Sequence, residues 1–197
     1  YVEFNLSDYD KKDSELIYYS SVEEAILNSP LNAENEEFSV PEDFLNHVDE
    51  ILHIWNGKQY DTIFYRAGSD NDPVQGFVMA RCKKQVEEAS VQYAFMNATP
   101  VTTKADSILI SDITELIHSS LKLSDFQQDL NPNYPDTRFV FGYAHDKEIY
   151  SLEVEGQKPD GVIEINVYDR TMYLWYYDDL KSDKRGNNLS YSVDVPE

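Results

Sequence analysis

The sequence predicts an α+β fold, in which an antiparallel meander sheet covered by short helices precedes a β-rich, sandwich-like C-terminal part. Three observations support this expectation. Strand-like runs separated by turn sequences fill residues 51–96, helix-start signatures occur on both sides of them, and further strand-like runs follow residue 137. This alternation of short elements with turns is typical of a sheet that buries one face beneath helices.

Three segments carry a helix-start signature, a Ser or Asp that is followed three positions later by Glu. The pairs are Ser21 with Glu24, Ser39 with Glu42, and Asp112 with Glu115. The third precedes an apolar stripe at helical spacing, formed by Ile113, Leu116, Ile117 and Leu121. We therefore expect three short helices, the first ending at Pro30 and the second including Val48.

Four consecutive runs of β-branched and aromatic residues predict the meander, over 51–55, 60–65, 76–83 and 90–96. Asn56-Gly57 between the first two is a strong hairpin signal. The segment 97–110 is expected to be irregular. Residues 16–19 lie just before the first helix. They are expected to form either a short strand or a hydrophobic staple that packs on this helix.

After the Pro- and Asn-rich segment 131–136, strands are expected over 138–143, 148–155, 161–168, 171–177 and 189–193, with a tight hairpin at Asp169-Arg170. Period-two alternation places five residues inward, namely Leu152, Val154, Ile163, Ile165 and Val167. The chain thus divides into an acidic arm (1–15), a helix-on-antiparallel-sheet domain (16–130) and a β-rich C-terminal subdomain (137–197).

The formal net charge of −21 disfavours nucleic acid and anionic lipid surfaces as direct partners. Residues 1–50 contain fourteen acids and two lysines, a net charge of −12. This charge indicates either a solvated arm or a docking face for a basic partner. No stretch is long and apolar enough for a membrane-spanning helix.

The motifs of common active sites are missing from the sequence. Cys82 is the single cysteine, which excludes an internal disulfide and a CxxC site, and its strand-like context predicts a buried thiol. The four histidines, at positions 47, 53, 118 and 145, form no metal-binding spacing. GxSxG, GxGxxG and P-loop sequences do not occur. We expect no catalytic residue, no metal and no cofactor.

Two acidic pairs have calcium-type ligands, Asp70 with Asp72 and Asp178 with Asp179. Neither continues into a loop with a central Gly and a terminal Glu, so both are interpreted as solvated turn residues.

The run 172–180 contains the candidate ligand-binding residues. Alternation places Tyr173, Trp175 and Tyr177 on one face of the strand. An exposed aromatic face would be a flat platform for a sugar or a peptide, whereas a covered one would be packed in the core.

Four stretches resemble a family of uncharacterised secreted lipoproteins of Gram-positive bacteria (Firmicutes). They are residues 18–26, with the "EEAI" helix, and residues 51–68, 76–84 and 138–156. The resemblance implies export and lipid anchoring through a cysteine upstream of this sequence, and it implies no activity.

The leading hypothesis is a non-catalytic, monomeric cell-envelope domain on the outer face of the membrane, which binds a protein or a small ligand. The first alternative is an intracellular (cytoplasmic) acidic protein of the immunity type, which would neutralise a basic partner. The second is a hydrolase with a carboxylate site that no motif reveals.

Overall fold

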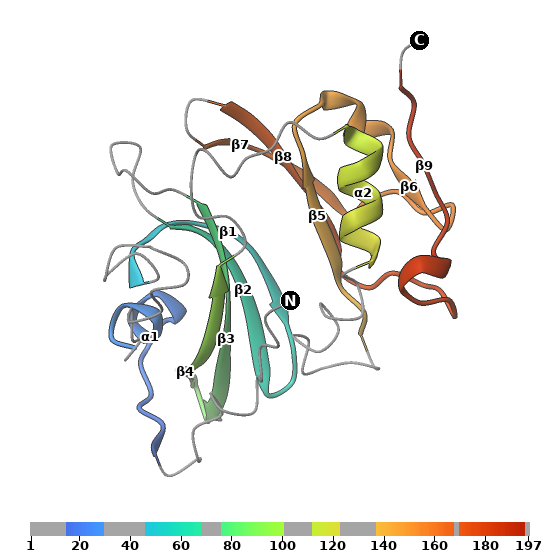
Figure 1. Ribbon diagram of the computed structural model, residues 1–197. Coiled ribbons are helices and arrows are strands. Elements are labelled where there is room, and N and C mark those ends of the chain that lie inside the picture. The colour runs from blue at the N-terminus through green and yellow to red at the C-terminus, as the bar shows by residue number, and fades with distance from the viewer. Residues whose placement is uncertain are drawn as a thin grey trace. The chain divides into compact units, whose positions relative to one another are not determined.

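The structure is a computed structural model that describes residues 15–29, 46–67, 76–100, 112–122, 137–167 and 170–195. The chain divides into two compact units, Tyr1–Ser107 and Ile108–Glu197 (Figure 1). Among the described residues, the first unit combines one antiparallel sheet with helix α1, and the second combines two antiparallel sheets with helix α2. The α+β class is therefore confirmed, with strand more abundant than helix in the described residues.

The first unit contains the expected four-stranded antiparallel meander, in the order β1-β2-β3-β4. Its strands are β1 (Val48–Asn56), β2 (Tyr60–Ala67), β3 (Gly76–Glu87) and β4 (Ser90–Pro100). All four are longer than the sequence predicted. Residues 97–100, expected to be irregular, extend β4, and Val48 begins β1 instead of belonging to a helix.

The first two strands form the expected hairpin, although the turn differs from a two-residue Asn-Gly turn. The strand pairing ends at Asn56 and Asp61, so that residues 57–60 lie between them. The buried Asp61 carboxylate accepts a hydrogen bond from the Gly57 N–H (3.0 Å) and pairs with Lys84 Nζ (2.7 Å). A buried side chain therefore holds the turn, which the local sequence alone does not reveal.

Helix α1 (Val22–Leu27) covers one face of this sheet. The Ser21 hydroxyl accepts a hydrogen bond from the Glu24 N–H (3.1 Å), as expected for an N-cap. The Glu24 carboxylate accepts from the N–H of Ser20 (3.2 Å) rather than from that of Ser21. Val22, Ala25 and Ile26 are buried, as predicted, in a cluster that continues into β2, β3 and β4.

The chain just before α1 contacts the edge of β4. Tyr19 and Tyr93 exchange two backbone hydrogen bonds of 2.8 Å, so the strand expected within 16–19 is reduced to an isolated β-bridge at Tyr19. Residues 1–14 of the predicted acidic arm lie outside the described residues, as does the second predicted helix up to residue 45.

The second unit begins with helix α2 (Ile113–Lys122), and its strands form a three-stranded sheet, β5-β8-β7, and a two-stranded sheet, β6-β9. The strands are β5 (Val140–Ala144), β6 (Glu153–Val154), β7 (Gly161–Val167), β8 (Arg170–Tyr177) and β9 (Tyr191–Ser192). The hairpin expected near Asp169-Arg170 is confirmed, because Val167 pairs with Arg170. The sandwich-like arrangement stays a prediction.

The expected strand over 148–155 is wrong for most of its length. Residues Lys147–Ser151 form a 3-10 helix, η5, and only Glu153–Val154 is strand. Ile149 and Leu152 are both buried, and their spacing of three fits a 3-10 turn better than a strand. A second short 3-10 helix, η6 (Gly186–Asn188), precedes β9, which is shorter than the expected 189–193.

The inward positions are confirmed for Leu152, Val154 and Ile165, which are buried. Ile163 is half-buried, and the side chain of Val167 is not among those that the structure describes.

The units divide between Ser107 and Ile108, before α2, instead of at the Pro- and Asn-rich segment 131–136. The buried stripe of α2 explains the difference, because Ile113, Ile117 and Leu121 pack with residues of β5 and β8. Prolines and asparagines mark a break in regular structure, but they do not determine which sheet a helix covers.

Candidate functional site

Two of the three predicted platform residues belong to the core of the second unit. Trp175 is 0% exposed and Tyr177 is 2% exposed, and their rings meet edge to face at 6.2 Å. The Tyr177 hydroxyl accepts a hydrogen bond from the Val154 N–H (3.2 Å) and donates one to the Gln157 carbonyl (2.8 Å). An exposed three-ring platform is therefore wrong, because β8 is the central strand and α2 covers this face.

Tyr173, the third predicted residue, lies half-buried at the margin of the same core. Its ring meets the ring of Tyr150 edge to face, with 5.7 Å between centroids. Tyr150 belongs to η5 and is 55% exposed. Tyr150 was not among the predicted site residues, because its segment was expected to be a strand. The spacing of Ile149 and Leu152 is the signal that could have revealed an outward-facing residue between them.

Carboxylates from three places in the second unit act on Tyr173. Glu164 of β7 lies directly opposite Tyr173 of β8 in the sheet, and Asp146 and Glu148 come from the turn and the 3-10 helix after β5. Burial raises the pKa of the Tyr173 hydroxyl, and the charges of Glu164, Tyr150, Glu148 and Asp146 raise it further. We call these five residues the tyrosine–carboxylate surface, namely Tyr150, Tyr173, Asp146, Glu148 and Glu164.

The chemistry of this surface favours binding over catalysis. A raised pKa keeps the phenol of Tyr173 protonated near neutral pH, which makes it a poor base and a poor nucleophile. Aromatic faces and carboxylates both attract cations, and an exposed ring can contact a Lys or Arg side chain directly. The arrangement therefore suits a positively charged group.

The four histidines all lie in the described parts of the chain. No group of three His, Cys, Asp or Glu side chains there is arranged to hold a metal ion. Burial lowers the pKa of His145, while the charge of Asp146 raises it and that of Arg170 lowers it. The His145 imidazole is therefore neutral near pH 7.

Cys82 is a buried thiol, as the sequence predicted. Burial raises its pKa to about 12, with a further contribution from the charge of Asp61. A thiol in this state is unreactive at neutral pH.

The two acidic pairs that were interpreted as solvated turn residues have different outcomes. Asp70 and Asp72 lie outside the described residues. The Asp178 N–H donates a hydrogen bond to Asp160 (2.6 Å), and Asp179 accepts one from the Arg138 N–H (3.0 Å). Asp179 also pairs with Lys181. These contacts organise the loop after β8.

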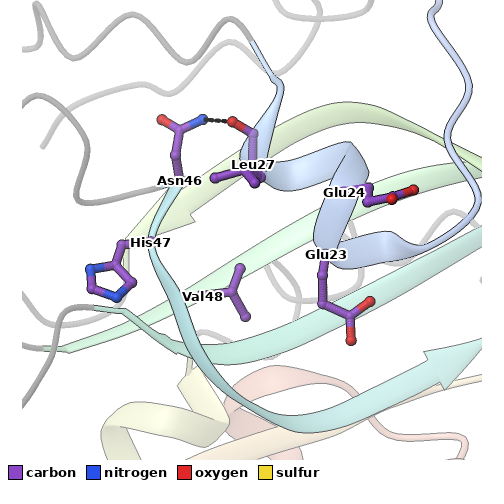
Figure 2. A pocket seen from close by; sticks show the side chains of 6 residues that line it. All are labelled: Glu23, Glu24, Leu27, Asn46, His47 and Val48. Carbon is purple, nitrogen blue, oxygen red and sulfur yellow. Dashed lines mark hydrogen bonds between the residues drawn. The ribbon is translucent and has the colours of Figure 1, made fainter.

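A hollow of about 430 Å³ lies between α1 and the start of β1 in the first unit (Figure 2). Its lining consists of Glu23, Glu24, Leu27, Asn46, His47 and Val48. The Asn46 amide donates to the carbonyls of Ile26 (3.0 Å) and Ser29 (3.1 Å) and so caps the end of α1.

The side chains around this hollow do not converge. Figure 2 shows Glu23 and His47 at opposite ends of it, with Val48 between them. Glu24 is bound to Ser20. Across the hollow, Asn46 ties the end of α1 to the start of β1.

Comparison with family models, with curated proteins and with solved structures found no match to this chain. Among the described residues, the helices are too short or too polar to cross a membrane.

Proposed function

We propose that this protein is a non-catalytic binding domain of the cell envelope, and that its tyrosine–carboxylate surface holds a Lys or Arg side chain of a partner protein. One observation carries this proposal. The exposed ring of Tyr150 stands edge-on to Tyr173 where three carboxylates act on the same hydroxyl. A single cationic side chain could contact a ring and a carboxylate together.

Electrostatics supports a basic partner at two length scales. At the surface itself, a cation over an exposed aromatic ring gains about 0.5–1 kcal/mol, and the nearby carboxylates add to this attraction. Over longer distances, the net charge of −21 accelerates the approach of a positively charged partner, most strongly at low salt.

The experiment is a calorimetric titration with a Lys-Gly repeat peptide at low and at physiological salt. We expect Tyr150→Ala and Glu164→Gln each to weaken binding about fivefold, because a contact of about 1 kcal/mol corresponds to that factor. The matched control is Asp183→Asn, which removes one exposed charge of the same unit, and we expect less than a twofold effect. Equal weakening by all three variants would show that only overall charge matters.

The envelope location is the second part of the proposal, and the resemblance of four segments to secreted lipoproteins supports it. It is tested by adding protease to intact cells that express the complete gene product. Degradation of the domain without lysis is the expected result.

Protection from protease until lysis would favour the other candidate, an intracellular acidic protein that neutralises a basic partner. The net charge of −21 supports that candidate equally well. Peptide binding at the tyrosine–carboxylate surface is expected in either compartment, so the two experiments test separate parts of the proposal.

A further inference from the structure

A row of polar side chains crosses the whole sheet of the first unit. The strand register pairs Trp55 of β1 with Thr62 of β2, Thr62 with Arg81 of β3, and Arg81 with Asn97 of β4. Residues directly opposite each other in antiparallel strands project from the same face. These four side chains, which we call the polar row, therefore stand side by side.

The polar row lies on the face of the sheet that points away from α1. The neighbouring row, shifted by one residue along each strand, contains Ile63 and Ala80, which pack in the cluster beneath α1. Because successive residues of a strand alternate between faces, the polar row must point the other way. A β-bulge in β4 lies beside it, where the pairing shifts between Asn97 and Phe95. Bulges are frequent next to functional sites, where they redirect a side chain.

Two members of the polar row are buried with unused hydrogen-bonding atoms. Thr62 is 1% exposed and Asn97 is 7% exposed. Neither Thr62 Oγ1 nor Asn97 Nδ2 has a hydrogen-bond partner within the described residues. Buried polar atoms are paired in the great majority of native proteins, because an unpaired one loses its bonds to water without replacement. A ligand that reached this row would supply a hydrogen-bond partner for both atoms.

The chemistry of the row identifies the kind of partner. Asn97 Nδ2, the Trp55 indole N–H and the Arg81 guanidinium are hydrogen-bond donors, and the Thr62 hydroxyl can also donate. The Arg81 guanidinium lies over the ring of Tyr60, 5.7 Å from its centroid. This set matches a ligand that has several acceptor oxygens on a negatively charged group.

The residues around the polar row indicate more closely which class of ligand fits it. The adjacent rows on the same face contain Tyr60, Lys83 and Ala94 on one side, and His53, Phe64 and Met79 on the other. Among these described rows there is no Asp or Glu, although the chain has 37 acids. Phe64 and Met79 are apolar residues of the neighbouring row on the same face, so we expect the part of the ligand beside them to be hydrocarbon or aromatic.

We propose that the polar row binds a small carboxylate whose body is apolar, with the carboxylate oxygens accepting hydrogen bonds from Thr62, Asn97 and Arg81. This site is in the first unit and takes an anion. It is therefore independent of the cation-binding surface proposed above for the second unit.

The experiment uses benzoate as the probe, with benzyl alcohol as its uncharged counterpart and inorganic phosphate as an oxyanion without an apolar body. Binding is followed by nuclear magnetic resonance of the ¹⁵N-labelled chain, through the side-chain signals of Asn97 and Trp55. We expect benzoate to shift both signals saturably, phosphate to shift them more weakly, and benzyl alcohol to leave them unchanged. A response to phosphate alone would overturn the apolar part of the proposal, and no saturable shift by any probe would overturn the site.

The decisive variant is Thr62→Val, which removes the hydroxyl and keeps the shape of the side chain. If the hydroxyl serves a ligand, its loss weakens benzoate binding about tenfold while the unfolding midpoint of the ligand-free protein stays unchanged or rises. If the hydroxyl is satisfied internally or by a structural water, the variant lowers the midpoint, which contradicts the proposal. Thr171→Val, at an exposed position of the second unit, is the control and should change neither measurement.

Discussion

Both units of this protein pack an α-helix on an antiparallel sheet, but they differ in how strand order in the sheet follows the order of the strands in the sequence. In the first unit, each strand pairs with its neighbour in the sequence, and α1 covers the sheet from the N-terminal side of the chain. In the second unit, β8 lies between β5 and β7, and the last strand, β9, pairs with β6. Turn signals determine most of a sheet with sequential neighbours, whereas a sheet with long-range pairing depends on which side chains find a common core.

The two helices provide the strongest test of this comparison. Ile26 of α1 and Ile117 of α2 are both fully buried, each in the core of its own unit. Truncation of either residue to Ala should cost about 2–5 kcal/mol of the free energy of unfolding. Chemical denaturation followed by tryptophan emission measures this effect, because Trp55 belongs to the first unit and Trp175 to the second.

We expect Ile26→Ala to lower mainly the midpoint that Trp55 reports, and Ile117→Ala mainly the midpoint that Trp175 reports. Leu27→Ala, at an exposed position of α1, is the control and should change stability by less than about 0.5 kcal/mol. Identical shifts of both signals in both variants would contradict the division into two separate cores.

Gly142 tests the packing that is specific to the second unit. A β-carbon at this position would collide with the Trp175 ring and with the Ser120 hydroxyl of α2. Gly142→Ala should therefore destabilise the protein by about 1–3 kcal/mol through overpacking. The double variant with Trp175→Leu, which provides space, should lose less stability than the two single effects predict. Simple additivity, measured by denaturation, would argue against this contact.

The helix caps are expected to have smaller and similar effects in the two units. Ser21 accepts a hydrogen bond from a backbone N–H at the start of α1, and Asp112 accepts one from the Thr114 N–H (2.7 Å) at the start of α2. Replacement of either residue by Ala should cost about 1 kcal/mol. Ser119→Ala, at an exposed position of α2, is the matched control and should be neutral or slightly stabilising in a thermal melt.

A pH dependence is also expected in the second unit. Hydrogen bonds from Lys184 and Ser190 lower the pKa of Glu155 from the usual 4.5 to about 2. The unfolded chain binds this proton at the higher pH, so the stabilisation is present above about pH 4.5 and is lost as the pH falls toward 2. Glu155→Gln should flatten this part of the pH–stability curve, whereas Glu153→Gln should retain it.

Much of the first unit could be predicted from the sequence, because its signals are local. Asn56-Gly57 marked the first hairpin, and Ser21 with Glu24 marked the start of α1. The polar row could not be predicted, because it depends on the register of three strand pairs and on a bulge before Asn97. Register follows from packing and turn geometry over the whole sheet, and no short motif encodes it.

The candidate site of the second unit was only partly predictable. Alternation correctly placed Tyr173, Trp175 and Tyr177 on one face, but β8 is apolar or aromatic on both faces, so the pattern could not indicate which face is covered. Trp175 and Tyr177 are buried because β8 is the central strand and α2 covers their face of the sheet. Tyr150 was missed because residues 148–155 were expected to form one strand, whereas Lys147–Ser151 is a 3-10 helix that turns Tyr150 outward.

The contact between Tyr19 and Tyr93 covers part of an exposed sheet edge. β4 is an edge strand, and unpaired backbone groups on such a strand can recruit a second chain. The two hydrogen bonds between Tyr19 and Tyr93 occupy part of that edge, near the exposed cross-strand valines Val86 and Val91. Removal of the segment before α1 is expected to free these backbone groups beside an exposed apolar pair, and so to favour the association of two chains through β4.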